Sequence, residues 1–156
     1  RRVPLRIWTH VIPCTGLFLV SCLTHTSNVL IHVPEPNAAC QMARDIAARV
    51  ASEFRLREAN RTGIDPVLPD DSMVLSRFLA YRSADSQLPG SGHTVYLTVF
   101  SEKDCREIAF AFTDYDDGQE TAFVAQMRSR LVELIRENQP NAVISVRETT
   151  TRTLPP

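Results

Sequence analysis

The chain has 156 residues, a formal net charge of −1 and a hydrophobic content of 44%. A chain of this length is long enough to bury one core and is near the usual size of a single domain. Its 17 basic and 18 acidic residues give none of the basic excess that is typical of nucleic-acid-binding proteins.

The start of the chain has the three parts of a secretory signal. Three arginines lie within the first six residues, an apolar run without acidic residues covers 7–19, and small or aliphatic residues precede Cys22. An apolar run of about 13 residues is too short to cross a bilayer of about 30 Å as a helix. Pro13 and Gly16 also interrupt it as an ordinary core helix.

The sequence Leu19-Val20-Ser21-Cys22 resembles the lipobox of bacterial lipoproteins, in which an aliphatic, a variable and a small residue precede a cysteine that receives a diacylglyceryl group. The resemblance covers the first 22 residues. It implies removal of residues 1–21 as a signal peptide and a membrane anchor of acyl chains on Cys22. Leu23 in place of aspartate implies, by the enteric sorting rule, an outer-membrane lipoprotein facing the periplasm.

Cleavage would change both the charge and the set of cysteines. Without residues 1–21 the chain has 135 residues and a net charge of −4, because the removed part holds three arginines and no acid. Besides the acylated Cys22, only Cys40 and Cys105 would remain, in an oxidising compartment where disulfides persist. Our hypothesis is that these two are bonded to each other. The alternative is two separately buried, small apolar side chains.

After Cys22 and Leu23 the sequence is polar as far as Asn28. We interpret residues 22–28 as a lipidated tether and residues 29–33 as the first strand, because this run is rich in β-branched residues and ends at two prolines. Apolar residues at spacings of three and four predict an amphipathic helix over 38–59, with Asn37 as its N-cap.

The middle of the chain predicts loops and strands. Residues 60–72 and 83–93 are rich in Gly, Pro, Asp and Ser and are expected to be loops on either side of a strand at 73–82. Two clear alternating runs, 94–100 and 107–113, flank a polar turn and predict a β-hairpin. Its core-facing residues would be Val95, Leu97, Val99, Ile108, Phe110 and Phe112.

A second helix is expected to begin near Gln119, because Asp117 and Glu120 have the spacing of a capping box, and to end before Pro140. Its apolar stripe consists of Phe123, Met127, Leu131, Leu134 and Ile135. Residues 142–148 then form a last strand, and residues 151–156 form a flexible tail.

These elements predict a single α+β domain over residues 29–150 in the order β-α-β-β-β-α-β. The expected architecture is a two-layer sandwich, with both helices on one face of an antiparallel or mixed sheet.

No residue pattern predicts a catalytic site, a cofactor or a metal centre. His25 falls in the expected tether and His32 alternates outward on the first strand, so a histidine-dependent site would rest on His93. The acidic group at 114–120 lacks the spacing of a calcium loop, and acids that complement a helix dipole explain it more simply.

The preferred function is therefore a non-enzymatic envelope lipoprotein that binds a protein partner or assists assembly, without nucleic acid. The alternative is an envelope hydrolase or cell-wall-modifying enzyme that uses His93 with Asp70, Asp71 or the aspartates of 114–117. A third interpretation is a plain soluble domain whose first 22 residues are an artefact of a fragmentary reading frame.

Overall fold

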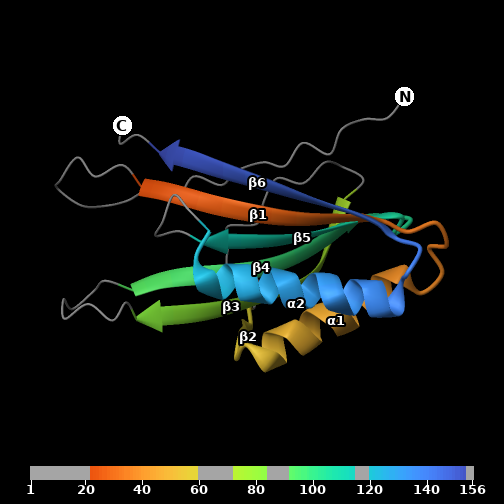
Figure 1. Ribbon diagram of the computed structural model, residues 1–156, viewed down its shortest axis with the longest axis horizontal. Helices are drawn as coiled ribbons and strands as arrows, with labels where there is room; N and C mark the ends of the chain where they lie inside the picture. The colour runs from red at the N-terminus through yellow and green to blue at the C-terminus, as the bar shows by residue number, and fades with distance from the viewer. Residues whose placement is uncertain (1–21, 60–71, 84–91, 115–119, 154–156) are drawn as a thin grey trace.

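The computed structural model describes residues 22–59, 72–83, 92–114 and 120–153 (Figure 1). Within these ranges the chain forms six strands and two helices. In chain order they are β1 (Cys22–His32), α1 (Ala39–Glu53), β2 (Arg57–Glu58), β3 (Ser72–Ser83), β4 (Gly92–Glu102), β5 (Glu107–Asp114), α2 (Ala122–Asn138) and β6 (Val143–Thr153).

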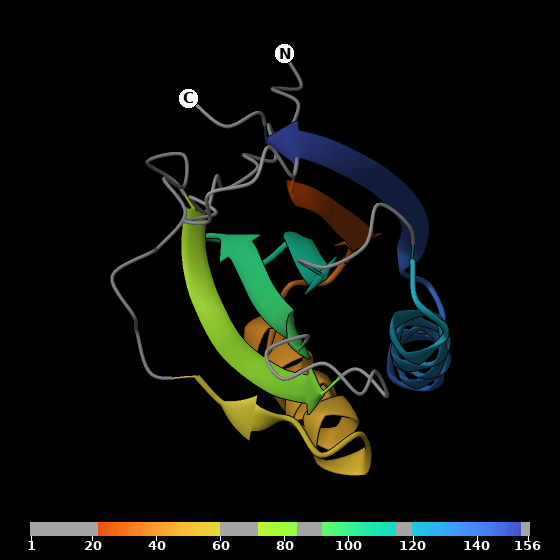
Figure 2. The ribbon, with the colours of Figure 1, turned by 90° about the vertical axis from the view of Figure 1, so that its left-hand side faces the viewer.

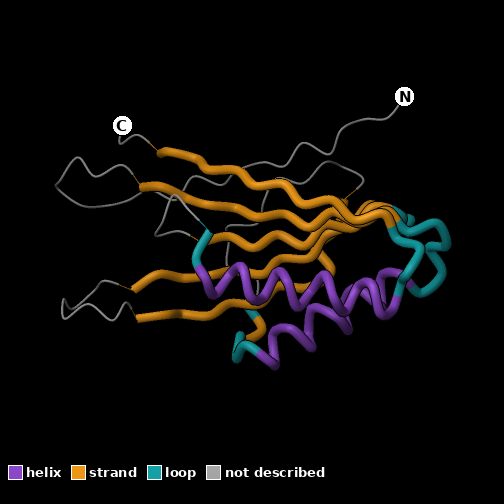
Figure 3. Tube along the Cα trace, in the orientation of Figure 1, coloured by secondary structure: helices purple, strands orange, loops and turns teal. Residues whose placement is uncertain are grey.

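The strands form one sheet in the order β2-β3-β4-β5-β1-β6, and every neighbouring pair is antiparallel. Both helices lie on the same face of this curved sheet, as Figures 2 and 3 show. The predicted two-layer α+β sandwich is therefore confirmed. The two-residue strand β2, which pairs with Phe78 and Leu79 of β3, is an addition to the predicted order.

The hairpin predicted for residues 94–100 and 107–113 is confirmed as β4 and β5, each of them slightly longer than expected. Leu97 lies opposite Phe112 and Val99 opposite Phe110. All six side chains predicted to face the core are buried in the main hydrophobic cluster. Because successive side chains alternate between faces, these six lie on one face of the hairpin, and both helices pack against that face.

The helices bury the apolar stripes that their sequences predict. In α2, Met127, Leu131, Leu134 and Ile135 are fully buried in the core. Phe123, in the first turn of α2, is partly buried and meets the Phe54 ring edge to face, with 5.8 Å between ring centroids. This contact joins α2 to the C-terminal end of α1.

Three of the four helix ends differ from those predicted, whereas α2 ends at Asn138, before Pro140, as expected. The N-cap of α1 is Ala38 rather than Asn37, and it makes no side-chain cap hydrogen bond. The helix ends at Glu53 rather than residue 59, because Arg55 adopts a φ of 59° that turns the chain toward β2. The N-cap of α2 is Thr121, whose Oγ1 accepts a hydrogen bond from the Val124 amide at 3.3 Å. The proposed cap Asp117 lies outside the described residues.

The tether expected at residues 22–28 is instead the first part of β1. Residues 24–28 are all polar, so no apolar alternation marks this segment as a strand. They are nevertheless held on both sides, by β5 from His25 onward and by β6 along the whole length of β1. Ser27 and Asn28 are fully buried. Pairing with a strand on each side, and not local hydrophobicity, therefore holds this segment in the strand conformation.

β6 is longer than predicted and runs to Thr153, so residues 151–153 belong to the sheet and not to a flexible tail. It pairs with β1 from Cys22 opposite Thr153 to His32 opposite Val143. The sheet therefore reaches beyond the predicted domain limits of 29 and 150 at both ends. In the described part of the chain, no helix is long and apolar enough to cross a membrane.

Candidate functional site

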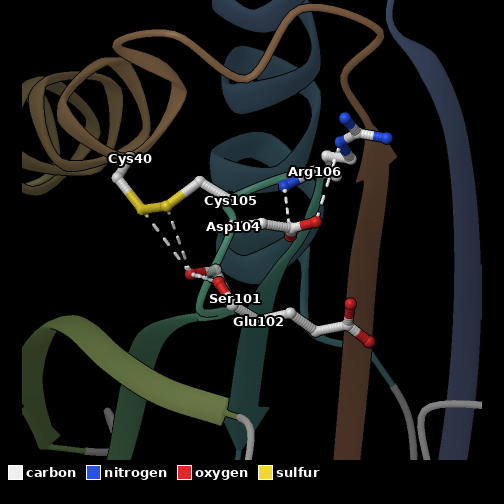
Figure 4. Close-up of a disulfide and its surroundings, with 6 residues drawn as sticks. All are labelled: Cys40, Ser101, Glu102, Asp104, Cys105 and Arg106. Atoms are coloured by element: carbon white, nitrogen blue, oxygen red, sulfur yellow. Dashed lines mark hydrogen bonds and ion pairs between the residues drawn. A yellow bond between two sulfur atoms is a disulfide. The ribbon is translucent and has the colours of Figure 1, made fainter.

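The structure joins Cys40 and Cys105 in a disulfide (Figure 4). Cys40 lies in the first turn of α1, and Cys105 lies in the turn between β4 and β5 with a positive φ of 57°. Their Cα atoms are 5.5 Å apart, within the usual range for a disulfide. The bond therefore fastens the start of α1 to the β4–β5 hairpin.

The hydroxyl of Ser101 lies beside both sulfur atoms. Its Oγ is 3.6 Å from the Cys40 sulfur and 3.8 Å from the Cys105 sulfur, and it donates a hydrogen bond to the Glu102 carbonyl at 2.9 Å. Ser101 itself is buried. The disulfide is thus part of the interior packing where the hairpin meets α1.

Cys22, the residue predicted to be acylated, is the first residue of β1 and pairs with Thr153. Residues 1–21, and with them the rest of the lipobox-like sequence, lie outside the described residues. No spacer separates position 22 from the sheet. An anchor at this residue would therefore be attached directly to the end of the sheet where β1 begins and β6 ends.

A row of polar residues is buried on the helix-facing side of the sheet near that end. His25 of β1 lies opposite Asp114 of β5, and Ser27 lies one step along β1 on the same face. His25 is 3% exposed, and Ser27 and Asp114 are fully buried. His25 Nδ1 and Ser27 Oγ have no hydrogen-bond partner among the described residues.

An ion pair between Glu120 and Arg128 of α2 lies next to this row. The Arg128 guanidinium donates to both carboxylate oxygens of Glu120, at 2.9 and 2.7 Å, and approaches Glu148 of β6 at 4.0 Å. Burial by itself would raise the pKa of Glu120. The hydrogen bonds and charge of Arg128, with a smaller effect of the charge of His25, outweigh burial and lower that pKa below 4.5. The same hydrogen bonds raise the pKa of Arg128.

From the sequence, His25 was expected in the tether and Ser27 had no expected role. Histidine, serine and aspartate are the residue types of nucleophilic catalysis, but here each side chain is at least nine-tenths buried. A substrate has no access to them in this arrangement. The row is therefore a set of buried polar side chains on neighbouring positions of β1 and β5.

The residues of the alternative hydrolase are placed as follows. Asp114 is buried, while Asp70, Asp71 and the acidic residues of 115–117 lie outside the described residues. His93 belongs to β4, two residues before Val95, which is the partner of Asp114. His32 is exposed, as predicted, and pairs with Glu107. Within the described ranges, no group of three His, Cys, Asp or Glu residues could hold a metal ion.

β6 forms one edge of the sheet, and its strand partner among the described residues is β1. It carries the two large hydrophobic side chains that stand exposed on the described surface, Val143 at 65% and Val146 at 41%. Its pairing with β1 runs through eleven residues without a bulge, and the strand contains no proline. Bulges and prolines are two of the devices with which natural sheets block pairing at their edges. Charged side chains are a third, and β6 carries them at Arg147, Glu148 and Arg152.

The opposite edge of the sheet is short and irregular. It ends in β2, which has two residues, and β3 behind it has an irregular register between Val74 and Ser76. Short edge strands and bulges both hinder pairing with another chain. Among the described residues, the sheet thus has one protected edge and one long, regular edge with no further strand beside it.

No family model and no curated protein matches this sequence. Among solved structures the chain is similar to Foldit4, a de novo designed protein, at 11% identity over 83% of this chain and 99% of that protein, with a TM-score of 0.40. It is also similar to LFR1 1, a designed protein with a ferredoxin fold, at 15% identity over 84% and 83%, with a TM-score of 0.36. Likeness at this level carries no argument about family or function.

Proposed function

We propose that this protein is a small lipid-anchored envelope lipoprotein whose α+β domain acts as a non-enzymatic binding or assembly module. The observation that carries the proposal is the open edge of β6. It offers a partner eleven consecutive residues of regular strand, with exposed Val143 and Val146. Binding by strand addition obtains affinity from main-chain hydrogen bonds and specificity from alternate side chains.

The disulfide supports the choice of compartment. Disulfides persist in secreted and periplasmic proteins and are rare in reducing compartments. The Cys40–Cys105 bond, together with the lipobox-like Leu19-Val20-Ser21-Cys22, agrees with export to the periplasmic face of an outer membrane.

The anchor and the open edge would act together. Cys22 and Thr153 are paired at the same end of the sheet, so acyl chains on Cys22 would hold this end against the lipid surface. The open edge of β6 would then be held close to the membrane, within reach of other envelope components.

The anchor is tested by metabolic labelling with an alkyne analogue of palmitate in a bacterium that expresses the full chain from a start codon ahead of Arg1. We expect the label on the parent chain and on the matched Cys14→Ser variant, and none on Cys22→Ser. Label on Cys22→Ser, or an unlabelled parent chain, would contradict the proposal.

A further inference from the structure

We propose that the strand that pairs with β6 is β6 of a second copy of this chain, so that two domains form one continuous antiparallel sheet about a two-fold axis. This inference rests on the binding role proposed above and names its partner. Closed two-fold dimers are the commonest oligomers, and each contributes the same surface patch. A single open edge per domain satisfies that requirement, because the other edge is protected by the short β2 and the irregular β3.

Two-fold symmetry restricts the register of such a pair. In an antiparallel pair that keeps both helix layers on one side, one residue of β6 must lie opposite its own copy. Registers centred on Arg147 or Glu148 would place two like charges directly opposite each other, which is unfavourable. The remaining registers are centred closer to one or other end of the strand.

The exposed valines select one of these registers. With Val146 opposite its own copy, two β-branched side chains meet at the axis, a favourable cross-strand pair. Val143 then lies opposite Thr149 of the second copy, and Glu148 lies opposite Ile144 of the second copy. This register opposes no like charges and covers both valines, which are 41% and 65% exposed in the single chain.

A cysteine scan along β6 tests both the dimer and its register. The Cβ atoms of directly opposed residues are about 4.5 to 5.5 Å apart, close enough for a disulfide to form with a small adjustment. We therefore expect Val146→Cys in the full chain to give a covalent dimer on a non-reducing gel under mild oxidation. The matched variants Ser145→Cys and Glu148→Cys should not, because the two copies of each are offset along the strands by two and four residues. The parent chain run alongside measures cross-linking by its own cysteines.

Sedimentation equilibrium of the full chain gives a second reading. The parent chain should be a dimer, and Val146→Lys should weaken the dimer at least about tenfold by placing two ammonium groups at the axis. Val143→Lys, at the more exposed valine, faces a threonine and should weaken it less.

A cross-link at Val146→Cys that is absent from both matched variants, together with a dimeric parent, would support the inference. A monomeric parent, or cross-linking strongest at another position, would overturn it. Neither result alters the palmitate labelling of Cys22, so failure of the second-copy assignment is distinguishable from failure of the lipoprotein proposal.

Discussion

Removal of the Cys40–Cys105 disulfide should destabilise the fold strongly. The two cysteines are 65 residues apart in sequence. In the chain-entropy account, a bond that closes a loop of this length restricts the unfolded chain by about 4 kcal/mol at 25 °C. We expect the Cys40→Ala/Cys105→Ala variant to lose about 3 to 4 kcal/mol of unfolding free energy. For a domain of this size that loss lowers Tm by roughly 10 to 20 °C.

The assay is guanidinium unfolding followed by circular dichroism, on the oxidised parent, the reduced parent and the double variant. The reduced parent and the double variant should lose the same amount of unfolding free energy, because both lack the bond while their core is otherwise the same. The double variant should not respond to reductant. If both species lost less than about 1 kcal/mol, the bond would not be the constraint described here.

Three further substitutions test the interior. Glu120→Gln breaks the bidentate, charged hydrogen bonding with Arg128 and should lower the unfolding free energy at pH 7 by about 1 to 3 kcal/mol. Because folding lowers the pKa of Glu120 below 4.5, this contribution is present above that pH and is lost as the pH falls through the lowered pKa, so urea unfolding of parent and variant should converge in acid. Asn28→Leu replaces a fully buried amide that has no hydrogen-bond partner among the described residues, and should raise the urea midpoint by an amount equivalent to about 1 kcal/mol; a lowered midpoint would refute that account of Asn28. Leu131→Ala should cost about 2 to 5 kcal/mol in the same measurement, since Leu131 is fully buried, and a loss below about 1 kcal/mol would contradict its place in the core.

The parts of the fold that were predictable are those whose signal is local. The stripe from Met127 to Ile135 repeats at helical spacing, and the runs 94–100 and 107–113 alternate with a polar turn between them. In each of these segments a burial pattern is written into neighbouring residues, and the structure buries the predicted side chains.

The first half of β1 was not predictable in this way. Residues 24–28 are all polar, and their strand conformation comes from β5 and β6, which lie far away in sequence. The helix starts were missed for a related reason. Asn37, a good capping residue, directly precedes the true cap Ala38, and the expected cap Asp117 lies four residues before the true cap Thr121. Tertiary packing decides which residue is used.

The candidate site depends on the same long-range information. Spacing alone cannot bring Cys40 and Cys105 within bonding distance, because their separation of 65 residues fixes no geometry. The strand at 142–148 was expected, but its position at the edge follows from the pairing of β6 with β1 rather than from its composition. Burial of His25 and Ser27 was not expected, because a tether would lie outside the core of the domain.

The central claim is the lipid anchor on Cys22, and the intact mass of the membrane-extracted protein under non-reducing conditions tests it most directly. The account predicts the mass of residues 22–156 plus acyl chains, less the hydrogens lost in the Cys40–Cys105 bond. An unmodified mass that includes residues 1–21 would contradict it.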